Sequence, residues 1–542
     1  MTDSLTGKLT IRGIVFDYEE FEKFVGMRST EELQRELTIT KTKQISNRFM
    51  TRTETCYRII KSKDRKLILF SRFSLEAIKA KIKCSRLARN LSVGWKFQNT
   101  IAPGEFIKAE TLLPGPTLDL NQTIAMDHLI NTVYATESEL IGRSSTVLVM
   151  GTGMGKSYMA AAAVGRIGRK TLIIAPSDIV LSETRSALSN SYPTLIIGEY
   201  NCNTKIDGDV VLMIINSALN DEFVFTTKQR IPGQRKLELQ TVRYKWYEYF
   251  SKFGFVIYDE IHNYTSTNRQ EIFWRTNFRF GLGLTATPNE NSWEMDMVFQ
   301  RHVGDLIREA DIPNYNQNQI VWQGSVIPIY YEGPSEHTRR ILNDVTGWTS
   351  HGDMCNQFTR DPYRNKLIMT LLVQLWKENR NVFVFSRTRE HVDRMAGEFS
   401  TLVEGGTKTD DTNHISIALM GGASSETVHA ARSASMIFIT YDYGWQGVSI
   451  PKMDTLVFTT PRVAKMRQIR GRITRKSGDI TIHRRIYDIV DANTELGKNE
   501  FRERKKIFNE ESNFKFNILP KVSVSWDNIP DEITANLSDA FI

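Results

Sequence analysis

The sequence predicts an α/β protein in which two lobes, each built on a parallel β-sheet, follow a small basic α+β region. Two observations lead to this prediction. Near-continuous apolar segments of strand length alternate with helical stretches through most of the chain, as is typical of parallel strands buried on both faces. The prolines and the glycine of Leu113–Pro116 interrupt any regular element and separate the lobes from the residues before them.

The composition is that of a globular protein with several domains. Of the 542 residues, 41% are hydrophobic and 24% are charged, which is close to the average for globular chains. The four cysteines lie far apart, so we expect neither a disulfide framework nor a zinc site. No apolar stretch approaches the roughly 20 residues of a membrane span, and the first residues lack the pattern of a secretory signal. We therefore expect no membrane association and an intracellular location.

A concentrated positive charge marks the first part of the chain, residues 1–112. Between Lys41 and Thr100 there are sixteen Lys and Arg and three Asp and Glu, a net charge of +13 in a chain whose total is +8. A surface that binds a polyanion has this kind of charge, because each phosphate that it neutralises releases counterions. We therefore predict that residues 1–112 form a nucleic-acid-binding domain, with short strands at Thr55–Ile60 and Lys66–Phe70.

The candidate contacts of this domain lie on a predicted helix, Leu75–Leu91. Leu75, Ile78 and Ile82 have the spacing of one helix face. A neighbouring face carries the basic candidates Lys79, Lys83 and Arg86. Aromatic residues are interleaved with the basic ones, and they would either stack on bases or form the core of the domain: Phe49, Tyr57, Phe70 and Phe73.

Apolar strands define two lobes, at residues 118–312 and 361–492. In the first lobe we expect strands at Thr146–Met150, Thr171–Ala175, Val210–Ile215, Phe255–Tyr258 and Phe280–Leu284. In the second lobe we expect them at Asn381–Phe385, Ile415–Leu419, Ser435–Ile439, Thr455–Phe458 and Arg485–Val490. The polar, proline-broken segment Ile312–Gln319 begins a connector, which we place at residues 313–360. The tail, residues 493–542, starts with a charged helical stretch at Leu496–Phe508 and ends in a loop-rich segment.

A glycine-rich loop, Met150–Ser157, follows the first strand of the first lobe. Its glycines let backbone N–H groups surround a phosphate, Lys156 can neutralise the terminal phosphates, and the Ser157 hydroxyl can bind Mg²⁺. The full pattern begins with glycine where this chain has Met150, but a strand before the loop and an alanine-rich helix after it are the required context. We therefore predict an ATP site formed by Gly151, Thr152, Gly153, Gly155, Lys156 and Ser157.

Two adjacent carboxylates, Asp259 and Glu260, follow a later apolar strand of the same lobe. In this position Asp259 can hold Mg²⁺, and Glu260 can accept a proton from the water that attacks the γ-phosphate. An isolated Asp-Glu pair is often only a solvated part of a loop. Its place after an apolar strand, downstream of a phosphate loop, favours the catalytic interpretation.

Phosphoryl transfer also needs positive charge where negative charge develops, and arginine usually supplies it. The segment Gln468–Arg475 of the second lobe contains Arg472 and Arg475, three residues apart on a predicted helix, so they would share one face. If they act on a nucleotide held by Lys156, the two lobes must close on it.

Motifs at Gly153–Ser157, Ala175–Ser177, Asn216–Ser217, Asp259–His262, Thr285–Thr287, Phe385–Arg387, Thr440, Gly447–Ser449 and Gln468–Arg475 follow one another in this order. This series covers about residues 118–492 and resembles the complete motif set of superfamily 2 helicases of the DExH type. The resemblance implies two RecA-like P-loop lobes in tandem, ATP and Mg²⁺ as cofactors, and a nucleic-acid-dependent ATPase or helicase.

The resemblance also implies roles for single residues. Gln122 resembles the glutamine that reads adenine, although it could be a surface glutamine at a helix start, and Gly447 belongs to the ATP-site motifs. His262, Thr285 and Thr287 would couple hydrolysis to movement. Alternatively, the two threonines would only form a turn. Gln468 and His262 would together relay the state of the nucleotide between the lobes. Ser449 stands where many relatives have aspartate. Contacts to one nucleic-acid strand are implied for Pro176, Ser177, Ser217, Arg387 and Thr440.

The order of a basic N-terminal domain, two motor lobes and the DEIH sequence is similar to that of the poxvirus transcript-release helicase and the phage recombination helicase. It implies a large-DNA-virus protein that moves 3′ to 5′, on DNA more than on RNA, in transcription elongation or release or in replication and repair. Such a protein would associate with a transcription or replication complex. It would act in the host cytoplasm, in viral factories, with packaging in the virion as a further option.

Other functions remain open from the sequence. A duplex translocase would hydrolyse ATP without separating strands, and we identify no wedge that would split a duplex. A small-molecule kinase would have no use for the arginines of the second lobe. A nucleic-acid-binding subunit with an inactive ATPase would have lost Lys156, Asp259, Glu260 or Arg475, and all four are present.

Overall fold

The computed structural model describes the chain except for residues 1–3, 46–47, 62–64, 90, 92–93, 136–143, 231–236, 290–294, 316–321, 405–415, 445–449, 476–477, 511–513 and 534–542. It contains two compact units. The first spans Met1–Asn316 apart from the loop residues Thr152–Met154, and the second contains Gln317–Ile542. Within the described ranges, no helix combines the length and the apolar character needed to cross a membrane.

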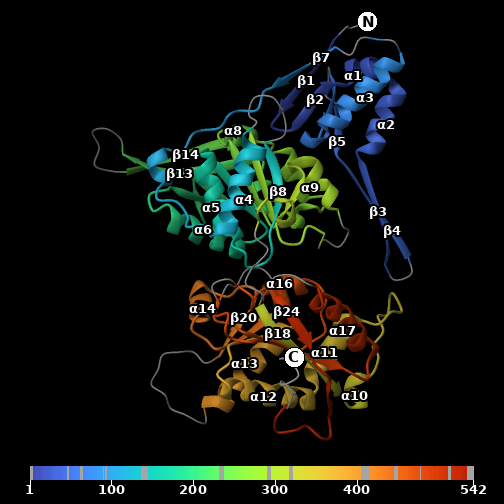
Figure 1. Cartoon of the computed structure of the whole chain (residues 1–542), viewed down its shortest axis with the longest axis vertical. Coiled ribbons are helices and arrows are strands. Elements are labelled where there is room, and N and C mark those ends of the chain that lie inside the picture. The colour runs from blue at the N-terminus through green and yellow to red at the C-terminus, as the bar shows by residue number, and fades with distance from the viewer. Residues whose placement is uncertain are drawn as a thin grey trace. The chain divides into compact units, whose positions relative to one another are not determined.

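The first unit begins with an α+β region (Figure 1). Its sheet has the strand order β5-β6-β2-β1-β7. The strands are β1 (Leu5–Thr10), β2 (Gly13–Asp17), β5 (Tyr57–Lys61), β6 (Lys66–Phe70) and β7 (Trp95–Asn99), and the helices are α1 (Tyr18–Val25), α2 (Met27–Glu36) and α3 (Leu75–Ala88). β3 (Thr38–Ile45) and β4 (Arg48–Thr55) pair with each other in a separate antiparallel ribbon, which Figure 1 shows leaving this region.

Aromatic packing forms the core of this α+β region. Phe16, Phe21 and Phe70 lie in mutual contact, with ring centroids 4.9 to 6.2 Å apart. Phe70 is fully buried and Tyr57 packs against the same cluster. For these two residues, the core interpretation of the interleaved aromatic residues is therefore the correct one.

A parallel sheet fills the rest of the first unit, in the order β11-β10-β12-β9-β15-β16-β8-β17. Its strands are β8 (Ser145–Val149), β9 (Thr171–Ala175), β10 (Ile197–Tyr200), β11 (Lys205–Ile206), β12 (Val210–Ile214), β15 (Phe255–Asp259), β16 (Phe280–Thr285) and β17 (Leu306–Arg308). Every residue of β9 and of β15 is buried, which is the physical reason for their continuous apolar sequences. β11, at the edge, is antiparallel to β10.

Helices connect these parallel strands, as crossover connections require. They are α4 (Leu120–Leu129), α5 (Lys156–Ile167), α6 (Asp178–Ser191), α7 (Ile215–Ala218), α8 (Trp246–Phe250) and α9 (Asp296–Val303). A hairpin of β13 (Glu222–Arg230) and β14 (Leu237–Lys245) lies between β12 and β15 in the sequence. The predicted lobe with a parallel sheet is therefore confirmed.

The second unit is also built on a parallel sheet, with the order β20-β21-β19-β22-β23-β18-β24 and with β25 paired to β18. Its strands are β18 (Trp322–Glu332), β19 (Val382–Ser386), β20 (Ser416–Leu419), β21 (Met436–Thr440), β22 (Thr455–Phe458), β23 (Arg484–Asp491), β24 (Phe514–Ile518) and β25 (Val522–Ser525). Its helices are α10 (Ser335–Thr338), α11 (His351–Arg360), α12 (Pro362–Lys377), α13 (Arg389–Glu404), α14 (Ser425–Ala430), α15 (Tyr441–Gly444), α16 (Met466–Arg470) and α17 (Glu495–Phe508).

Two segments expected to lie outside the second lobe belong to its sheet. β18 falls within residues 313–360, which we predicted to be a connector, yet it lies between β23 and β24 and pairs with both. The tail was predicted to end in loops, but β24 and β25 add to the other side of β18. The polar flanks and prolines of these segments hid strands whose partners are distant in the sequence.

A buried ion pair fixes the tail helix α17 to the sheet. Arg504 of α17 holds Asp488 of β23 with two bonds of 2.7 Å, from Nε to Oδ2 and from Nη2 to Oδ1. The exposed fractions of the two side chains are 1% and 0%. The charges compensate each other away from water, so removing one would leave the other buried and unbalanced.

We expect Asp488→Asn to lower the free energy of unfolding of the second unit by about 3–5 kcal/mol, the usual result of breaking a buried pair. The control is Glu398→Gln, because Glu398 lies 3.9 Å from Arg394 on α13, and the two side chains are 48% and 35% exposed. Its effect should stay below about 1 kcal/mol. Urea denaturation of both variants measures these effects. Equal denaturation midpoints for Asp488→Asn and Glu398→Gln would contradict the prediction.

Candidate functional site

The glycine-rich loop lies between β8 and α5, as predicted. Gly153 and Gly155 have φ values of 78° and 83°, a region that side-chain-bearing residues rarely adopt. Lys156 begins α5 directly after Gly155. The loop therefore presents the unpaired N–H groups of a helix N-terminus, which is an arrangement that binds phosphate. Met150, at the departure from the glycine pattern, is buried, and its N–H donates to the carbonyl of Thr285 over 3.0 Å.

Gln122 lies against this loop. It forms a capping box at the start of α4, in which its N–H donates to Asp119 Oδ1 at 2.9 Å and its Oε1 accepts from the N–H of Asp119 at 3.0 Å. A Cβ atom placed on Gly155 would clash with the Gln122 Nε2 atom. Gln122 is buried, so it is not a surface glutamine, and its side-chain amide lies close to Gly155.

The two carboxylates lie at the carboxyl end of β15. Asp259 is buried and accepts from the Thr184 hydroxyl at 3.3 Å. Glu260 has a φ of 48°, a strained conformation of the kind that occurs at functional sites, and its Oε1 lies 3.6 Å from Lys156 Nζ. Lysine and carboxylate thus meet from two loops that are about a hundred residues apart in the sequence.

The electrostatics of this pair fit a divalent cation. Burial and the neighbouring Glu260 carboxylate raise the pKa of Asp259 well above its usual value. A bound cation would favour the charged form of Asp259 instead. Asp259 and the Ser157 hydroxyl, at the start of α5, are oxygen donors of the kind that Mg²⁺ prefers. These residues therefore suit the predicted Mg²⁺.

His262 connects Glu260 to the next strand. Its Nε2 atom lies 3.1 Å from Asn263 Nδ2, which donates, so the proton of the neutral ring is on Nδ1. That Nδ1 is 2.9 Å from the Thr285 hydroxyl and 3.4 Å from Glu260 Oε2. The same hydroxyl oxygen accepts the N–H of Thr287 at 3.1 Å. The three predicted coupling residues are therefore brought together.

The remaining predicted residues of the first lobe lie along the same edge of the sheet. Pro176 and Ser177 follow β9, and Ser217 lies in α7 after β12. β12, β9, β15, β16 and β8 are consecutive in the sheet and parallel, so the loops after them meet at one edge. The predicted site residues of this lobe lie at the carboxyl ends of these strands, in the loops or helix starts that follow them, or, like Gln122, against such a loop.

Glu309 is a site residue that no motif in the sequence indicated. Its Oε1 accepts the N–H of Gly151, the first glycine of the loop, at 3.2 Å. The two residues are 158 positions apart, and the pairing of β17 with β8 brings them together. No local sequence pattern could have predicted this contact.

In the second unit, Arg387 and Thr440 lie at the carboxyl ends of the neighbouring strands β19 and β21. The backbone N–H of Arg387 donates to the Thr460 hydroxyl at 3.0 Å, and its guanidinium contacts His351 Nδ1. His351 Nε2 lies 2.6 Å from Glu500 Oε1. Gly447 and Ser449 fall outside the described residues.

The arginine segment differs from its prediction. Gln468 lies on α16, but α16 ends at Arg470 with Gly471 as its cap. Arg472 and Arg475 therefore follow the helix in non-helical backbone and do not share a helix face. Arg472 is buried.

The basic candidates on α3 also need a correction. Arg86 is 4% exposed, and its guanidinium lies 3.8 Å from the ring centroid of Phe24. It continues the buried stripe of Leu75, Ile78 and Ile82, so it stabilises the core and is not placed to bind a phosphate. Lys83 is exposed, and Lys79 is half-buried and paired with Glu76 at 3.1 Å.

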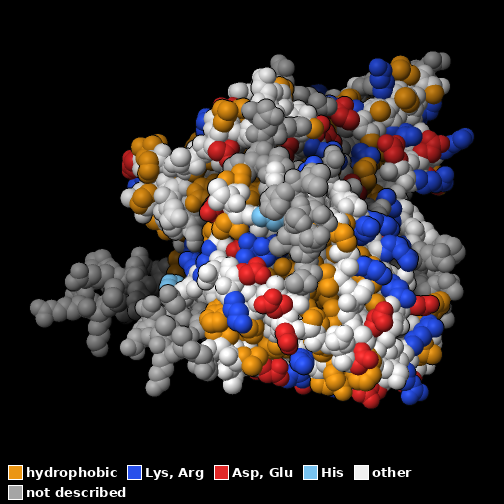
Figure 2. Space-filling view, turned by 60° about the horizontal axis from the view of Figure 1, so that its bottom comes forward, with side chains coloured by type: hydrophobic (Ala, Val, Ile, Leu, Met, Phe, Trp, Pro, Cys, Tyr) orange, Lys and Arg blue, Asp and Glu red, His pale blue; other side chains and the backbone are white. Residues whose placement is uncertain are grey.

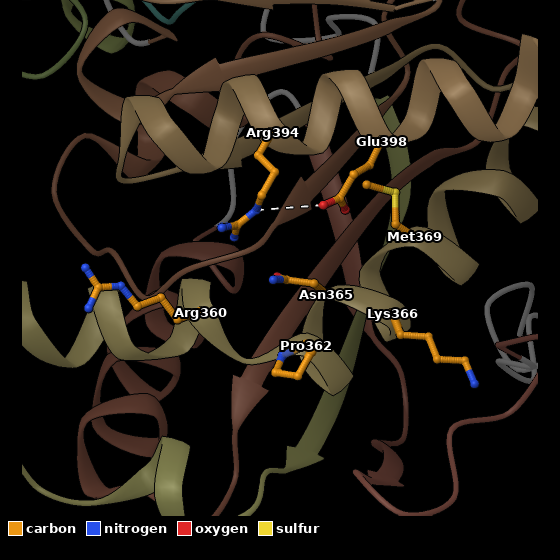
Figure 3. A pocket seen from close by; sticks show the side chains of 7 residues that line it. All are labelled: Arg360, Pro362, Asn365, Lys366, Met369, Arg394 and Glu398. Atoms are coloured by element: carbon orange, nitrogen blue, oxygen red, sulfur yellow. Dashed lines mark ion pairs between the residues drawn. The ribbon is translucent and has the colours of Figure 1, made fainter.

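A separate hollow of about 410 Å³ lies in the second unit (Figure 3). Arg394 and Glu398 point into it from α13, and Asn365 comes from α12. None of its lining residues belongs to the predicted site. Asn365 is already bonded to the carbonyl of Thr359 at 3.0 Å and to His391 Nε2 at 3.0 Å.

Comparison with known proteins agrees with the motif series. Residues 117–290 match the family model "Type III restriction enzyme, res subunit". The chain is 27% identical over 384 residues to the "Putative ATP-dependent RNA helicase QP509L" of African swine fever virus (isolate Pig/Kenya/KEN-50/1950), covering 67% of this chain and 68% of that protein. It is 28% identical over 210 residues to the "Putative DNA 3'-5' helicase Rad25" of Haloarcula marismortui, covering 36% of this chain and 30% of that protein.

Among solved structures, "The crystal structure of T4 UvsW" matches 96% of this chain and 100% of that chain, with 16% identity and a TM-score of 0.33. The motif series, the two parallel sheets and the helicase relatives agree with one another: the chain contains a helicase domain that matches the type III restriction enzyme family model, is homologous to viral proteins named "Putative ATP-dependent RNA helicase", and is a nucleic-acid-dependent ATPase or helicase.

Proposed function

We propose that the chain is an ATP-driven motor that moves 3′ to 5′ along nucleic acid, preferentially DNA, during transcription or during replication and repair in a large DNA virus. The observation that supports this most directly is the run of contacts from Lys156 through Glu260 and His262 to Thr285. It joins the residues that suit phosphate binding to those implied for coupling.

The chemistry begins with Lys156. Its ammonium group pairs with Glu260 in this structure, and the terminal phosphates of ATP would compete for the same positive charge. Binding of ATP would therefore draw Lys156 toward the phosphates and release Glu260 to accept the proton of the attacking water. Mg²⁺, held by Ser157 and Asp259, would neutralise charge on the phosphates.

His262 links the position and charge of Glu260 to Thr285. The ring donates from Nδ1, and both Glu260 Oε2 and the Thr285 hydroxyl lie within 3.4 Å of that atom. A change in the position or charge of Glu260 alters the balance between these two acceptors. Thr285 also holds the N–H of Thr287, so the change reaches the loop that the resemblance assigns to coupling. In the second unit, we propose that Arg472 and Arg475 supply positive charge for hydrolysis.

The choice between DNA and RNA depends on the resemblance, because the relatives carry different names. The African swine fever virus protein is named an RNA helicase and the archaeal one a DNA helicase. We favour DNA because of the resemblance in domain order. Positive charge for either polymer is present: Figure 2 shows Lys and Arg side chains gathered along one flank of the displayed face.

The deciding experiment measures ATP hydrolysis by the full chain without nucleic acid and with single-stranded DNA, duplex DNA, a forked DNA and RNA. We expect stimulation by DNA and displacement of a labelled strand from a fork with a 3′ tail. Stimulation without displacement would indicate a translocase on duplexes. Turnover that ignores every polymer would indicate a kinase-like enzyme and would refute the proposal.

Lys156→Ala should abolish ATP hydrolysis, because no other cation on the loop would hold the terminal phosphates, while binding to single-stranded DNA at low salt persists. Arg166→Gln is the matched control on the same helix, since Arg166 makes an exposed ion pair with Asp127, and its turnover should match that of the unmodified chain. A radiolabelled phosphate-release assay measures both. Retained turnover in Lys156→Ala would contradict the phosphate-loop assignment.

Glu260→Gln should leave ATP binding intact and slow hydrolysis by roughly 10²–10⁴-fold, the usual contribution of a general base. The amide has nearly the same shape but cannot take the proton. Equilibrium binding of a fluorescent ATP analogue and single-turnover hydrolysis separate the two effects. A loss of binding that equals the loss of hydrolysis would remove Glu260 from the role of base.

A further inference from the structure

The ribbon of β3 and β4 is joined to the first lobe through a buried carboxylate. Glu54, near the end of β4, is 6% exposed. Its Oε1 accepts from Arg52 Nε and Nη2 at 2.9 and 2.8 Å and from the Thr267 hydroxyl at 2.9 Å. Its Oε2 accepts from Gln270 Nε2. Two of these partners belong to the lobe and the third to the ribbon, so Glu54 connects the two.

Arg52 strengthens the same junction. It lies two residues before Glu54, on the same face of β4, and also donates from Nη2 to the carbonyl of Thr265. Where the ribbon meets the lobe, the charge of Glu54 is therefore neutralised and its carboxylate oxygens are hydrogen-bonded at the same time. A displacement of the ribbon from the lobe would remove the bonds that Thr267 and Gln270 donate to the buried Glu54 carboxylate, while Arg52 would move with it.

The lobe side of the junction continues directly into the catalytic segment. Thr265 and Thr267 follow His262 by three and five positions. The residues between them are hydrogen-bonded to the backbone of the two carboxylate residues. The N–H and the side-chain amide of Asn263 donate to the carbonyl of Glu260 at 3.0 and 3.2 Å. The Tyr264 hydroxyl donates to the carbonyl of Asp259 at 3.0 Å. A displacement at Thr265 would therefore reach both carboxylates.

The outer part of the ribbon has two different faces. On one face, threonine hydroxyls pair across the strands, Thr40 with Thr53 at 3.2 Å and Thr42 with Thr51 at 3.0 Å. On the other face, Lys41 lies opposite Arg52 and Lys43 opposite Met50. Lys43, Thr40, Thr42, Thr51 and Thr53 are exposed, and Lys41 is half-exposed.

Basic and hydroxyl side chains on a narrow two-stranded ribbon suit a phosphate backbone, since both donate hydrogen bonds to phosphate oxygens. Two other arginines between the N-terminal region and the first lobe already have partners within the lobe. Arg72 is buried against the carbonyls of Phe278 and Arg279, and burial lowers its pKa to about 10. Arg58 pairs with Glu271 at 2.6 Å.

We propose that the β3–β4 ribbon contacts the nucleic-acid backbone and that Glu54 transmits this contact to the Asp259–His262 segment, coupling nucleic-acid binding to ATP turnover. The inference rests on the proposed function, because it needs an ATPase that nucleic acid stimulates. Glu54 is a positioning residue in this scheme, since it touches neither polymer nor nucleotide. It places the catalytic segment according to what the ribbon binds.

The test exchanges two side chains across the junction. Glu54→Gln weakens the hold on Arg52, and Gln270→Glu places two carboxylates in contact. Each variant should keep the ATPase rate measured without nucleic acid and lose stimulation by single-stranded DNA by about tenfold, within the usual range of coupling between sites. The double variant Glu54→Gln with Gln270→Glu restores an amide–carboxylate bond with donor and acceptor reversed, so stimulation should recover.

The matched control is Arg58→Gln, which removes a charged pair between the same two parts of the chain but leaves Glu54 and its partners unchanged. Its stimulation should equal that of the unmodified chain. Thermal melting of all variants identifies any that fail to fold. Lys41→Gln with Lys43→Gln should flatten the salt dependence of DNA affinity, by about one unit of the log–log slope for each phosphate that the ribbon no longer neutralises.

The outcomes separate the two proposals. An unmodified chain whose ATPase ignores all nucleic acids would refute the proposed function. A stimulated chain in which both single variants remain fully stimulated would refute only the coupling through Glu54. An equal drop in Arg58→Gln would also overturn it, because the effect would then come from general loosening of the contact between the ribbon's domain and the lobe. An unchanged salt slope in the lysine variant would refute the contact with the backbone.

Discussion

The alignment of parallel strands in the first lobe is the constraint on which the site depends. In a parallel sheet, all carboxyl ends lie at one edge, so loops that are distant in the sequence meet there. β8 delivers the glycine-rich loop, β15 the two carboxylates, and β16 Thr285 to that edge. Lys156, Glu260, His262 and Thr285 are in contact because β8, β16 and β15 are neighbours, and a different strand order would separate them.

The balance of positive and negative charges then determines how the side chains of this site are paired. Lys156 balances Glu260, while Asp259 is buried close to that carboxylate and has a raised pKa. Two carboxylates and a single lysine leave an excess of negative charge that a divalent cation can offset. The same rule explains two junctions between elements, that of the ribbon with the first lobe and that of α17 with β23, where Glu54 and Asp488 are buried with arginines that neutralise them.

Much of the fold and of the first-lobe site could be predicted from local patterns. Continuous apolar segments mark strands buried on both faces, and the glycines at positions 153 and 155 occupy backbone conformations that favour glycine. Predictions failed where an element's role depends on a distant partner. β18 looked like a connector because its neighbours β23 and β24 are far away in the sequence, and Arg86 looked like a surface cation because helical spacing alone does not show that Phe24 covers it.

By itself, the sequence determined the types of element, the phosphate loop and the order of the motifs, because these depend on backbone preferences and on chemistry within a few residues. The tertiary structure alone decided which side chains meet. It brought Glu309 to Gly151 and Gln122 to Gly155, ended α16 before Arg472, and turned part of the basic N-terminal segment from a free surface into a junction with the lobe. The physical reason is that burial and pairing of a charge depend on neighbours that only the folded chain supplies.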